Sequence, residues 1–239
     1  MENIEQTYTR DDITLMNNNR VMLSGAIVGE PQKSHTIFGE GFYELRLSVN
    51  RLSSMQDVIP ITVPERLLAS ENLLDGMMIT VKGQFRSYNK IIGGRSKLML
   101  TMFVREIIHE TQMDNPNVIE LAGYICKSPI YRTTPFNREI ADILIAVNRT
   151  YNKSDYIPAI AWGRNARFAE GLKIGEKVYL SGRVQSREYQ KRLDSGEIET
   201  RTAYEISINK LSHEELPSLF DPHDTAFIAE DFDINEAIV

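Results

Sequence analysis

Short runs of alternating apolar and polar residues dominate the second half of the chain. Such runs, rich in Ile, Val, Tyr and Thr, are typical of half-buried β-strands. They predict strands over 118–125, 139–148, 155–162, 177–186 and 200–208. One segment, 165–172, has a helical pattern that ends near Gly171 and Gly175. We therefore expect an all-β fold with short helices.

The pattern repeats at a constant offset of 98 residues. LSGAI at 23–27 returns as LAGYI at 121–125, and VIP at 58–60 returns as YIP at 156–158. A period this long is the size of a domain, not of a solenoid repeat.

The repeat predicts four regions: a polar N-terminal arm, two similar domains and an acidic tail. Their bounds are 1–18, 19–110, 117–213 and 214–239. A linker of six residues spans at most about 20 Å, so the two domains must lie side by side.

Five strands with a helix between the third and the fourth is the order of an OB-fold, a partly open small barrel. Two tandem OB-fold barrels are therefore expected. Strand order alone leaves another kind of small barrel open.

Composition favours a soluble protein of the cytoplasm. The 239 residues are 42% hydrophobic and 25% charged, and no apolar run approaches the roughly 20 residues of a membrane helix. The N-terminus lacks the regions of a signal peptide. Cys126 is the only cysteine, which excludes an intrachain disulfide and favours a reducing compartment.

The net charge of −6 is unevenly distributed. Residues 118–213 contain 15 Lys and Arg against 11 Asp and Glu, whereas the tail has 8 acidic residues and neither Lys nor Arg. This asymmetry is typical of a binding domain beside an interaction tail. An ordinary solvated tail explains it equally well.

Aromatic and basic residues alternate on the outward faces of the predicted strands. Tyr156 and Trp162 share one face of the third strand, and Arg187 and Tyr189 lie outside on the fourth. Aromatic rings stack on the bases of a single strand for about 1–3 kcal/mol each, and cations attract its phosphates. The structural alternative is that these rings are half-buried core residues.

One stretch resembles a known family. The run REIADILIAVNR at 138–149, continued by YIPAIAWGR at 156–164 and YLSGRV at 179–184, closely resembles bacterial single-stranded-DNA-binding proteins. The resemblance covers the second repeat and extends weakly to the first. It implies an OB-fold protein, usually with four such domains acting together, that coats single-stranded DNA in replication, recombination and repair without catalysis.

The resemblance also implies site residues in the second repeat. The base-stacking positions match Tyr151, Tyr156, Trp162 and Tyr189. We assign phosphate binding to the basic residues around them: Arg149, Lys153, Arg164, Arg167, Arg183, Arg187 and Lys191.

The first repeat departs from this pattern. Ser53, Val58 and Pro64 stand where the second repeat has Tyr151, Tyr156 and Trp162. Tyr88 falls near the position of Tyr189, and it forms a secondary site with Arg51 and Arg86. Phe38, Phe42 and Tyr43 offer a substitute surface. We expect a structural or weakly binding copy.

The expected partners are single-stranded DNA and a second copy of the chain, because two chains would supply four OB-folds. The segment EDFDI at 230–234 only partly resembles the family's recruiting tail, so the tail contacts either replication proteins or the chain's own basic face. The four histidines lack metal-ligand spacing, and no phosphate-binding GxxxxGK[ST] motif is present. We therefore expect no metal, cofactor or catalysis. The alternative function is an OB-fold protein-interaction module of replication or mobile-element machinery.

Overall fold

The computed structural model describes residues 18–51, 53, 55–109, 117–192 and 196–220. Residues 1–17 of the predicted arm, the linker and residues 221–239 of the tail lie outside this part of the chain. The predictions about the arm and the end of the tail therefore have no structural outcome.

The first five strands close into a ring, here called the first barrel. Antiparallel pairs join β1 to β2 and β4, β2 to β3, and β4 to β5, and a short parallel pairing of β3 with β5 closes the ring. The strands are β1 (Asn19–Ile37), β2 (Glu40–Asn50), β3 (Gln56–Pro64), β4 (Met78–Ile92) and β5 (Arg95–Ile108). Helix α2 (Glu65–Ala69) follows β3.

The remaining strands repeat this ring as the second barrel. β6 pairs with β8 and β10, β8 pairs with β9, β10 pairs with β11, and a parallel pairing of β9 with β11 closes the ring. The strands are β6 (Asn117–Ile125), β8 (Glu139–Asn148), β9 (Ser154–Trp162), β10 (Lys177–Arg192) and β11 (Ile198–Ser212). Strand β7 (Ile130–Thr133) is added at the edge of β8, and a 3₁₀ turn (Thr150–Asn152) precedes β9.

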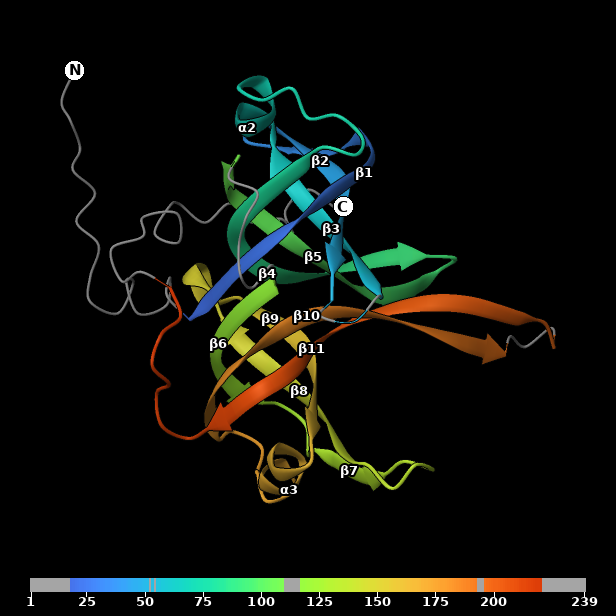
Figure 1. The fold of residues 1–239 in the computed structure, drawn as a ribbon, viewed down its shortest axis with the longest axis vertical. Helices are drawn as coiled ribbons and strands as arrows, with labels where there is room; N and C mark the ends of the chain where they lie inside the picture. The colour runs from blue at the N-terminus through green and yellow to red at the C-terminus, as the bar shows by residue number, and fades with distance from the viewer. Residues whose placement is uncertain (1–17, 52, 54, 110–116, 193–195, 221–239) are drawn as a thin grey trace.

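Alternation along the strands builds the cores. On β2, Leu45, Leu47 and Val49 are buried while Glu44 and Arg46 are exposed. The inward side chains of both barrels belong to one continuous apolar cluster. Figure 1 shows the first barrel above the second, with the β4–β5 and β10–β11 hairpins projecting on the same side.

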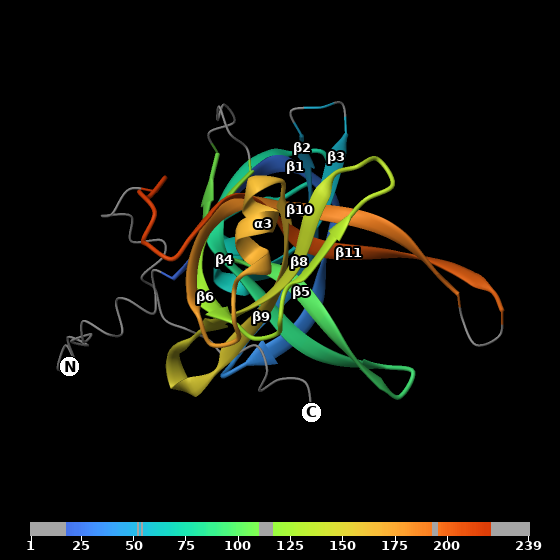
Figure 2. The same ribbon diagram turned by 90° about the horizontal axis from the view of Figure 1, so that it is seen from below.

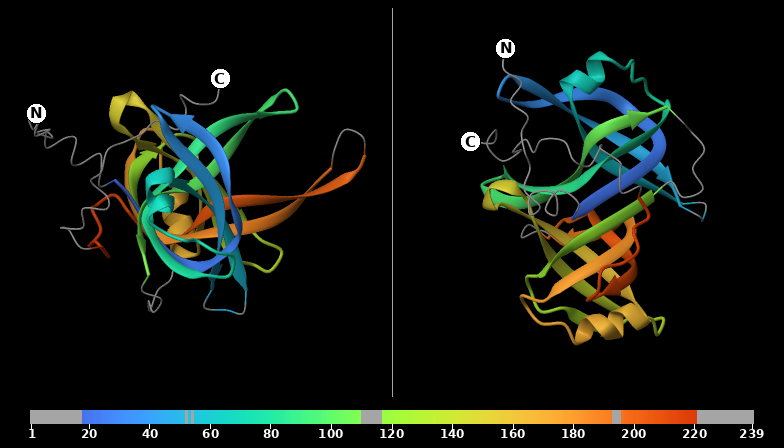
Figure 3. Two further views of the ribbon diagram at one scale, coloured as in Figure 1. Left: turned by 90° about the horizontal axis from the view of Figure 1, so that it is seen from above. Right: turned by 90° about the vertical axis from the view of Figure 1, so that its left-hand side faces the viewer.

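One short helix lies at each far end of the molecule. Helix α3 (Arg164–Glu170) covers the end of the second barrel, where Ala166 and Ala169 are fully buried (Figure 2). Helix α2 lies at the opposite end, beside the first barrel (Figure 3).

A glycine allows the same bulge in both barrels. The β4–β5 register shifts at Gly83, and the β10–β11 register shifts at Gly182. A Cβ atom at Gly182 would lie 2.3 Å from the Ser207 carbonyl oxygen, and one at Gly83 would lie 2.0 Å from that of Phe103. Both positions therefore need glycine, because a larger residue would push the neighbouring strand away.

The two barrels join through an antiparallel pairing of β1 with β6. Val21 lies opposite Ile119 at its centre, with Asn19 opposite Leu121 and Leu23 opposite Asn117. Val21 and Ile119 are equivalent residues of the repeat, so the ladder has local two-fold symmetry. Arg20 and Glu120 add an ion pair of 3.0 Å across this junction.

The predicted all-β class with short helices and OB-fold strand order is confirmed. The predicted bounds erred mainly on the fourth and fifth strands of the second repeat. The fourth strand extends to Arg192 and the fifth begins at Ile198, because the two strands continue beyond the barrel as a hairpin. The predicted helix at 165–172 is observed at Arg164–Glu170.

Candidate nucleic-acid interface

Strand β9 presents one aromatic side chain outward at each end. Tyr156 is 47% exposed and Trp162 is 39% exposed, while Ile157, Ala159 and Ala161 between them point into the barrel and are buried. Trp162 follows Tyr156 by six residue steps along the strand, which is about 20 Å at about 3.3 Å per residue. The rings are thus far enough apart to contact different bases of one strand.

The other two predicted stacking residues lie off this strand. Tyr189 is 36% exposed on the projecting β10–β11 hairpin, opposite Arg201, and the Arg187 guanidinium lies 5.9 Å from its ring centre. The backbone of Tyr151 belongs to the 3₁₀ turn, but its side chain is outside the described part of the structure.

Arg149 is buried between the two barrels rather than exposed on the surface. Its side chain is 8% exposed, and Nε lies 3.1 Å from Oδ2 of Asp155. Its guanidinium also donates to the backbone carbonyl of Ser87 in the first barrel, at 3.5 Å. This geometry favours a structural role for Arg149 over the predicted phosphate contact.

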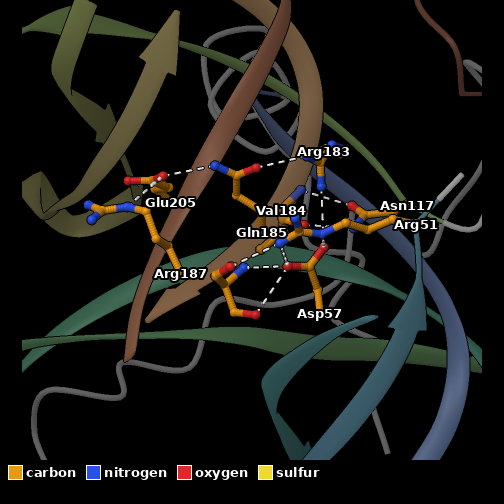
Figure 4. Close-up of polar contacts among 9 residues, drawn as sticks. Arg51, Asp57, Asn117, Arg183, Val184, Gln185, Arg187 and Glu205 are labelled. Atoms are coloured by element: carbon orange, nitrogen blue, oxygen red, sulfur yellow. Dashed lines mark hydrogen bonds and ion pairs between the residues drawn. The ribbon is translucent and has the colours of Figure 1, made fainter. Parts of the chain in front are cut away.

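Arg51 and Arg183 converge on one buried carboxylate, Asp57 (Figure 4). Arg51 donates from Nε to Oδ2 at 2.7 Å and from Nη2 to Oδ1 at 2.6 Å, and Arg183 Nη1 lies 3.2 Å from Oδ2. The backbone N–H of Ser186 donates to Oδ1 at 2.7 Å. Asp57 belongs to the first barrel and Ser186 to the second, so this cluster joins the two barrels.

Arg187 lies at the outer end of the same polar chain. Arg183 donates to Gln185, Gln185 donates to Glu205 at 2.8 Å, and Arg187 Nε lies 3.5 Å from Glu205 (Figure 4). The Arg187 side chain is 53% exposed, so it reaches solvent beside Tyr189 while its charge is partly balanced.

Three predicted cations lie at the exposed surface and one is partly buried. Arg167 is 63% exposed and lies 3.5 Å from Glu139. Arg164, at the start of α3, and Lys191, on the β10–β11 hairpin, are exposed, and Lys153 is partly buried. Arg164 follows Trp162 closely along the chain, so it is the best-placed cation for a phosphate near that ring.

The equivalent surface of the first barrel is different. Val58 is 37% exposed and Pro64 is buried, so neither offers a ring. Tyr88 packs against the cluster that contains Phe103, and burial raises its pKa to about 12. Arg86 is 1% exposed, with its guanidinium 4.8 Å from the Phe103 ring centre. Arg86 is therefore part of the interior, and Tyr88 is only partly accessible for a secondary site.

Sequence reasoning missed a contact from the first barrel to the strand that carries Tyr156. Ser87 donates its backbone N–H to Asp155 Oδ1 at 2.5 Å, and the Tyr156 N–H donates to the Ser87 hydroxyl at 2.8 Å. Ser87 thus holds the first residues of β9. The signal was available, because Ser87 and Asp155 are equivalent by the repeat to Ser186 and Asp57, which pair in the same way.

The two equivalent aspartates have opposite pKa shifts. Burial raises the pKa of Asp57, but the hydrogen bonds from Arg51 and Ser186 outweigh it, and the net pKa is lowered. For Asp155, burial dominates over the charges of Arg149 and Arg86, and the pKa is raised.

Among the described residues, no group of three or more His, Cys, Asp or Glu side chains is arranged to hold a metal ion. None of the helices described is long and apolar enough to cross a membrane.

Comparison with known proteins places the similarity in the second barrel. Residues 116–213 match the model of the single-strand binding protein family. Over 81 residues the chain is 35% identical to single-stranded DNA-binding protein A of Bacillus subtilis, covering 31% of this chain and 47% of that protein. It is 33% identical over 81 residues to single-stranded DNA-binding protein 2 of Listeria innocua, covering 31% of this chain and 51% of that protein. The chain thus spans about half the length of these curated relatives.

The fold of both barrels has a solved counterpart. The wild-type single-stranded DNA binding protein from Thermus aquaticus superposes with a TM-score of 0.64 over 85% of this chain and 96% of that chain, at 18% identity. A deletion mutant of the same protein gives a TM-score of 0.61 over 86% and 98%, at 20% identity.

These superpositions agree with the OB-fold of both barrels. The second barrel, residues 116–213, is what resembles the single-strand binding protein family, and the sequence likeness to the relatives lies there. The relatives from Bacillus and Listeria are named as DNA-binding proteins, which agrees with the predicted class of a binding protein.

Proposed function

We propose that the protein binds single-stranded DNA with little sequence preference, in support of replication, recombination or repair. Bases would stack on Tyr151, Tyr156, Trp162 and Tyr189. The observation that carries the proposal is the pair of outward rings at the two ends of β9, Tyr156 and Trp162. Every base has a π-face, so stacking on such rings tolerates any sequence.

Exposed cations near these rings would bind the phosphates. Arg164, Arg167, Arg187 and Lys191 are the members of the predicted set that reach the surface. The relatives from Bacillus and Listeria, which match the second barrel, are named as single-stranded DNA-binding proteins. Their names support the same ligand for this barrel.

Titration with oligo(dT) while tryptophan fluorescence is followed tests the proposal, because Trp162 is the only tryptophan. We expect quenching on binding and an affinity that falls as salt is raised, since bound phosphates release counterions. Binding without quenching would remove Trp162 from the stacking set. No binding at low salt would favour the alternative, a protein-interaction module, which the absence of rings at Val58 and Pro64 of the first barrel also favours.

We also propose a domain division at the predicted bounds and a homodimer with four barrels. The two closed strand rings of one chain support the division. Light scattering across a concentration series tests the dimer: a mass near 27.3 kDa throughout would exclude it. A cytoplasmic location and recruitment of replication proteins by the acidic tail remain proposals from the sequence.

A further inference from the structure

Two phenylalanines are more exposed than any other large hydrophobic side chain in the described part of the chain. Phe38 is 83% exposed and Phe136 is 86% exposed. They are equivalent residues of the 98-residue repeat. Phe38 occupies the turn between β1 and β2, and Phe136 occupies the turn between β7 and β8. Scattered exposed hydrophobics need no explanation, but the same ring at the same position of both barrels does.

The fold gains nothing from the ring at Phe38. The turn joins Ile37 to Glu40, which pair with each other, and its two central residues have positive φ angles, 46° at Phe38 and 86° at Gly39. Such a turn favours Asn or Gly at both central positions, and a bulky residue there is strained. Phe38 therefore costs conformational energy and leaves its ring in water. A contact outside the fold would explain why this residue is present.

The second turn, which holds Phe136, lies beyond the end of β9 that carries Trp162. The N–H of Gly163, directly after Trp162, donates to the carbonyl of Glu139 at 2.9 Å, so the segment that follows Phe136 contacts the end of β9 that carries Trp162. Arg138 and Arg164 are exposed there. Phe136 thus extends the row formed by Tyr156 and Trp162, with cations beside it.

The first turn occupies the equivalent place in the first barrel. Glu40 accepts from the backbone N–H of Arg66, and Gly41 donates to Glu65, so the turn lies against the start of α2. Helices α2 and α3 mark opposite ends of the molecule (Figure 1), and the two turns therefore lie near opposite ends. Single-stranded DNA bound along Tyr156 and Trp162 on β9 would reach Phe136 first. It would reach Phe38 only if it continued over the first barrel.

We propose that Phe136 and Phe38 are base-stacking residues that extend the binding surface to both ends of the molecule. This inference rests on the proposed binding of single-stranded DNA. It gives the first barrel a ring of its own. The two other aromatic residues predicted for a substitute surface in the first barrel are less accessible to a base. Phe42 is fully buried, and the partly buried Tyr43 donates its hydroxyl to Glu65.

The test compares Phe136→Ala and Phe38→Ala in the full chain with two lengths of oligo(dT). One length is about 12 nucleotides, within the span of one OB-fold, and the other is about 32 nucleotides, enough for two. We expect Phe136→Ala to weaken binding of both lengths by about 5- to 150-fold, the range of one lost stacked base. Phe38→Ala should weaken binding of the long oligonucleotide by a similar factor and leave binding of the short one unchanged.

Matched variants separate stacking from folding. Phe136→Trp and Phe38→Trp should keep the parent affinity, and the Leu variants, which keep apolar bulk without a π-face, should lose it. Phe38→Asn should lose affinity for the long oligonucleotide while its melting temperature stays equal or rises, because Asn suits the turn. Parent-like binding of both lengths by Phe136→Ala and Phe38→Ala would overturn the inference.

Trp162→Ala serves as the reference for the proposed function. If Trp162→Ala weakens binding and the two turn variants do not, the inference fails and the proposed function stands. If the parent protein itself binds neither oligonucleotide at low salt, the proposed function fails, and the inference with it.

Discussion

The two barrels share one frame and differ in the surface that the frame carries. Both close by the same strand pairings and use a glycine at the same bulge. At the ends of the third strand, however, the second barrel presents Tyr156 and Trp162, whereas the first has an exposed Val58 and a buried Pro64. The inward apolar pattern is therefore enough to keep the fold the same, because the outward side chains differ between the two barrels.

Two aspartate–serine contacts join the barrels and are here called the seam. They explain how the first barrel, which lacks these rings, still supports the candidate binding site. Asp57 of the first barrel binds Ser186 of the second, and Asp155 of the second binds Ser87 of the first. Ser87 also accepts from the N–H of Tyr156. The first barrel thus supports the strand that carries the candidate site, although its own equivalent of that strand lacks the rings.

The largest expected effect comes from breaking the seam. Asp155→Ala should lower the free energy of unfolding by about 3–5 kcal/mol, because it leaves the buried Arg149 without its carboxylate partner. Asp57→Ala should lower it by less, because Arg51 and Arg183 are 26% and 32% exposed and water can solvate them. Urea denaturation of the full chain measures it. Asp142→Ala is the matched control, since its ion pair with Arg132 is exposed and is worth about 1 kcal/mol or less. A loss no greater than that of the control would refute the structural importance of the seam.

The next effect separates the two surfaces. Tyr156→Ala and Trp162→Ala should each weaken oligo(dT) binding by about 1–3 kcal/mol through the loss of one stacked base. Val58→Ala and Pro64→Ala should leave the affinity unchanged. Fluorescence anisotropy of a labelled oligonucleotide measures all four variants, including the one that lacks the tryptophan. Equal losses of oligo(dT) affinity from variants of both barrels, in proteins with native circular dichroism, would contradict the assignment of the site to the second barrel.

The fold was largely predictable from the sequence because it depends on periodic features. Alternation placed the strands, and Ile157, Ala159 and Ala161 proved to face inward as expected. The extension of β10 was predicted only as far as Tyr189 and that of β11 was not predicted, because beyond the barrel both faces of a hairpin are exposed and its residues no longer alternate in polarity.

The candidate site was less predictable than the fold. Sequence identifies an arginine as a cation but does not reveal whether a carboxylate already neutralises it. Arg149 and Arg183 belong to the same predicted set as Arg164, yet the structure pairs Arg149 with Asp155 inside the second barrel and Arg183 with Asp57 of the first barrel. The pairing of Arg183 with Asp57 joins residues far apart in the chain, so no local pattern reports it. Arg149 and Asp155 are close in the sequence, but their spacing alone does not show that the two side chains meet. Only the matching positions of the two aspartates in the repeat hinted at a shared role.

A smaller effect distinguishes surface cations from seam cations. Arg164→Ala should reduce the slope of log K against log salt by about 0.7, the value of one phosphate contact with a single strand. Arg183→Ala should leave the slope unchanged and lower stability instead, since its guanidinium lies on Asp57. Oligo(dT) titrations at several salt concentrations, paired with melting curves, measure both quantities. A reduced slope for Arg183→Ala with unchanged stability would assign Arg183 to the phosphates after all.

The smallest effect is a pH dependence that differs in sign between the two halves of the seam. The folded-state pKa of Asp57 is lowered, so the stability it contributes is present above its unfolded pKa and is lost as the pH falls through the folded value. The pKa of Asp155 is raised, so its contribution is present below the unfolded pKa and is lost as the pH rises through the folded value.

Stability curves of the parent, Asp57→Asn and Asp155→Asn check these signs. The difference between the parent and Asp57→Asn should shrink from about pH 4 downward, whereas the difference between the parent and Asp155→Asn should shrink from about pH 4 upward. Differences are compared because every other carboxylate cancels in them. Two differences that change in the same direction would show that the aspartates, although equivalent in the repeat and in their serine partners, do not differ in electrostatic environment. The seam would then be two-fold symmetric in its energetics as well as in its contacts.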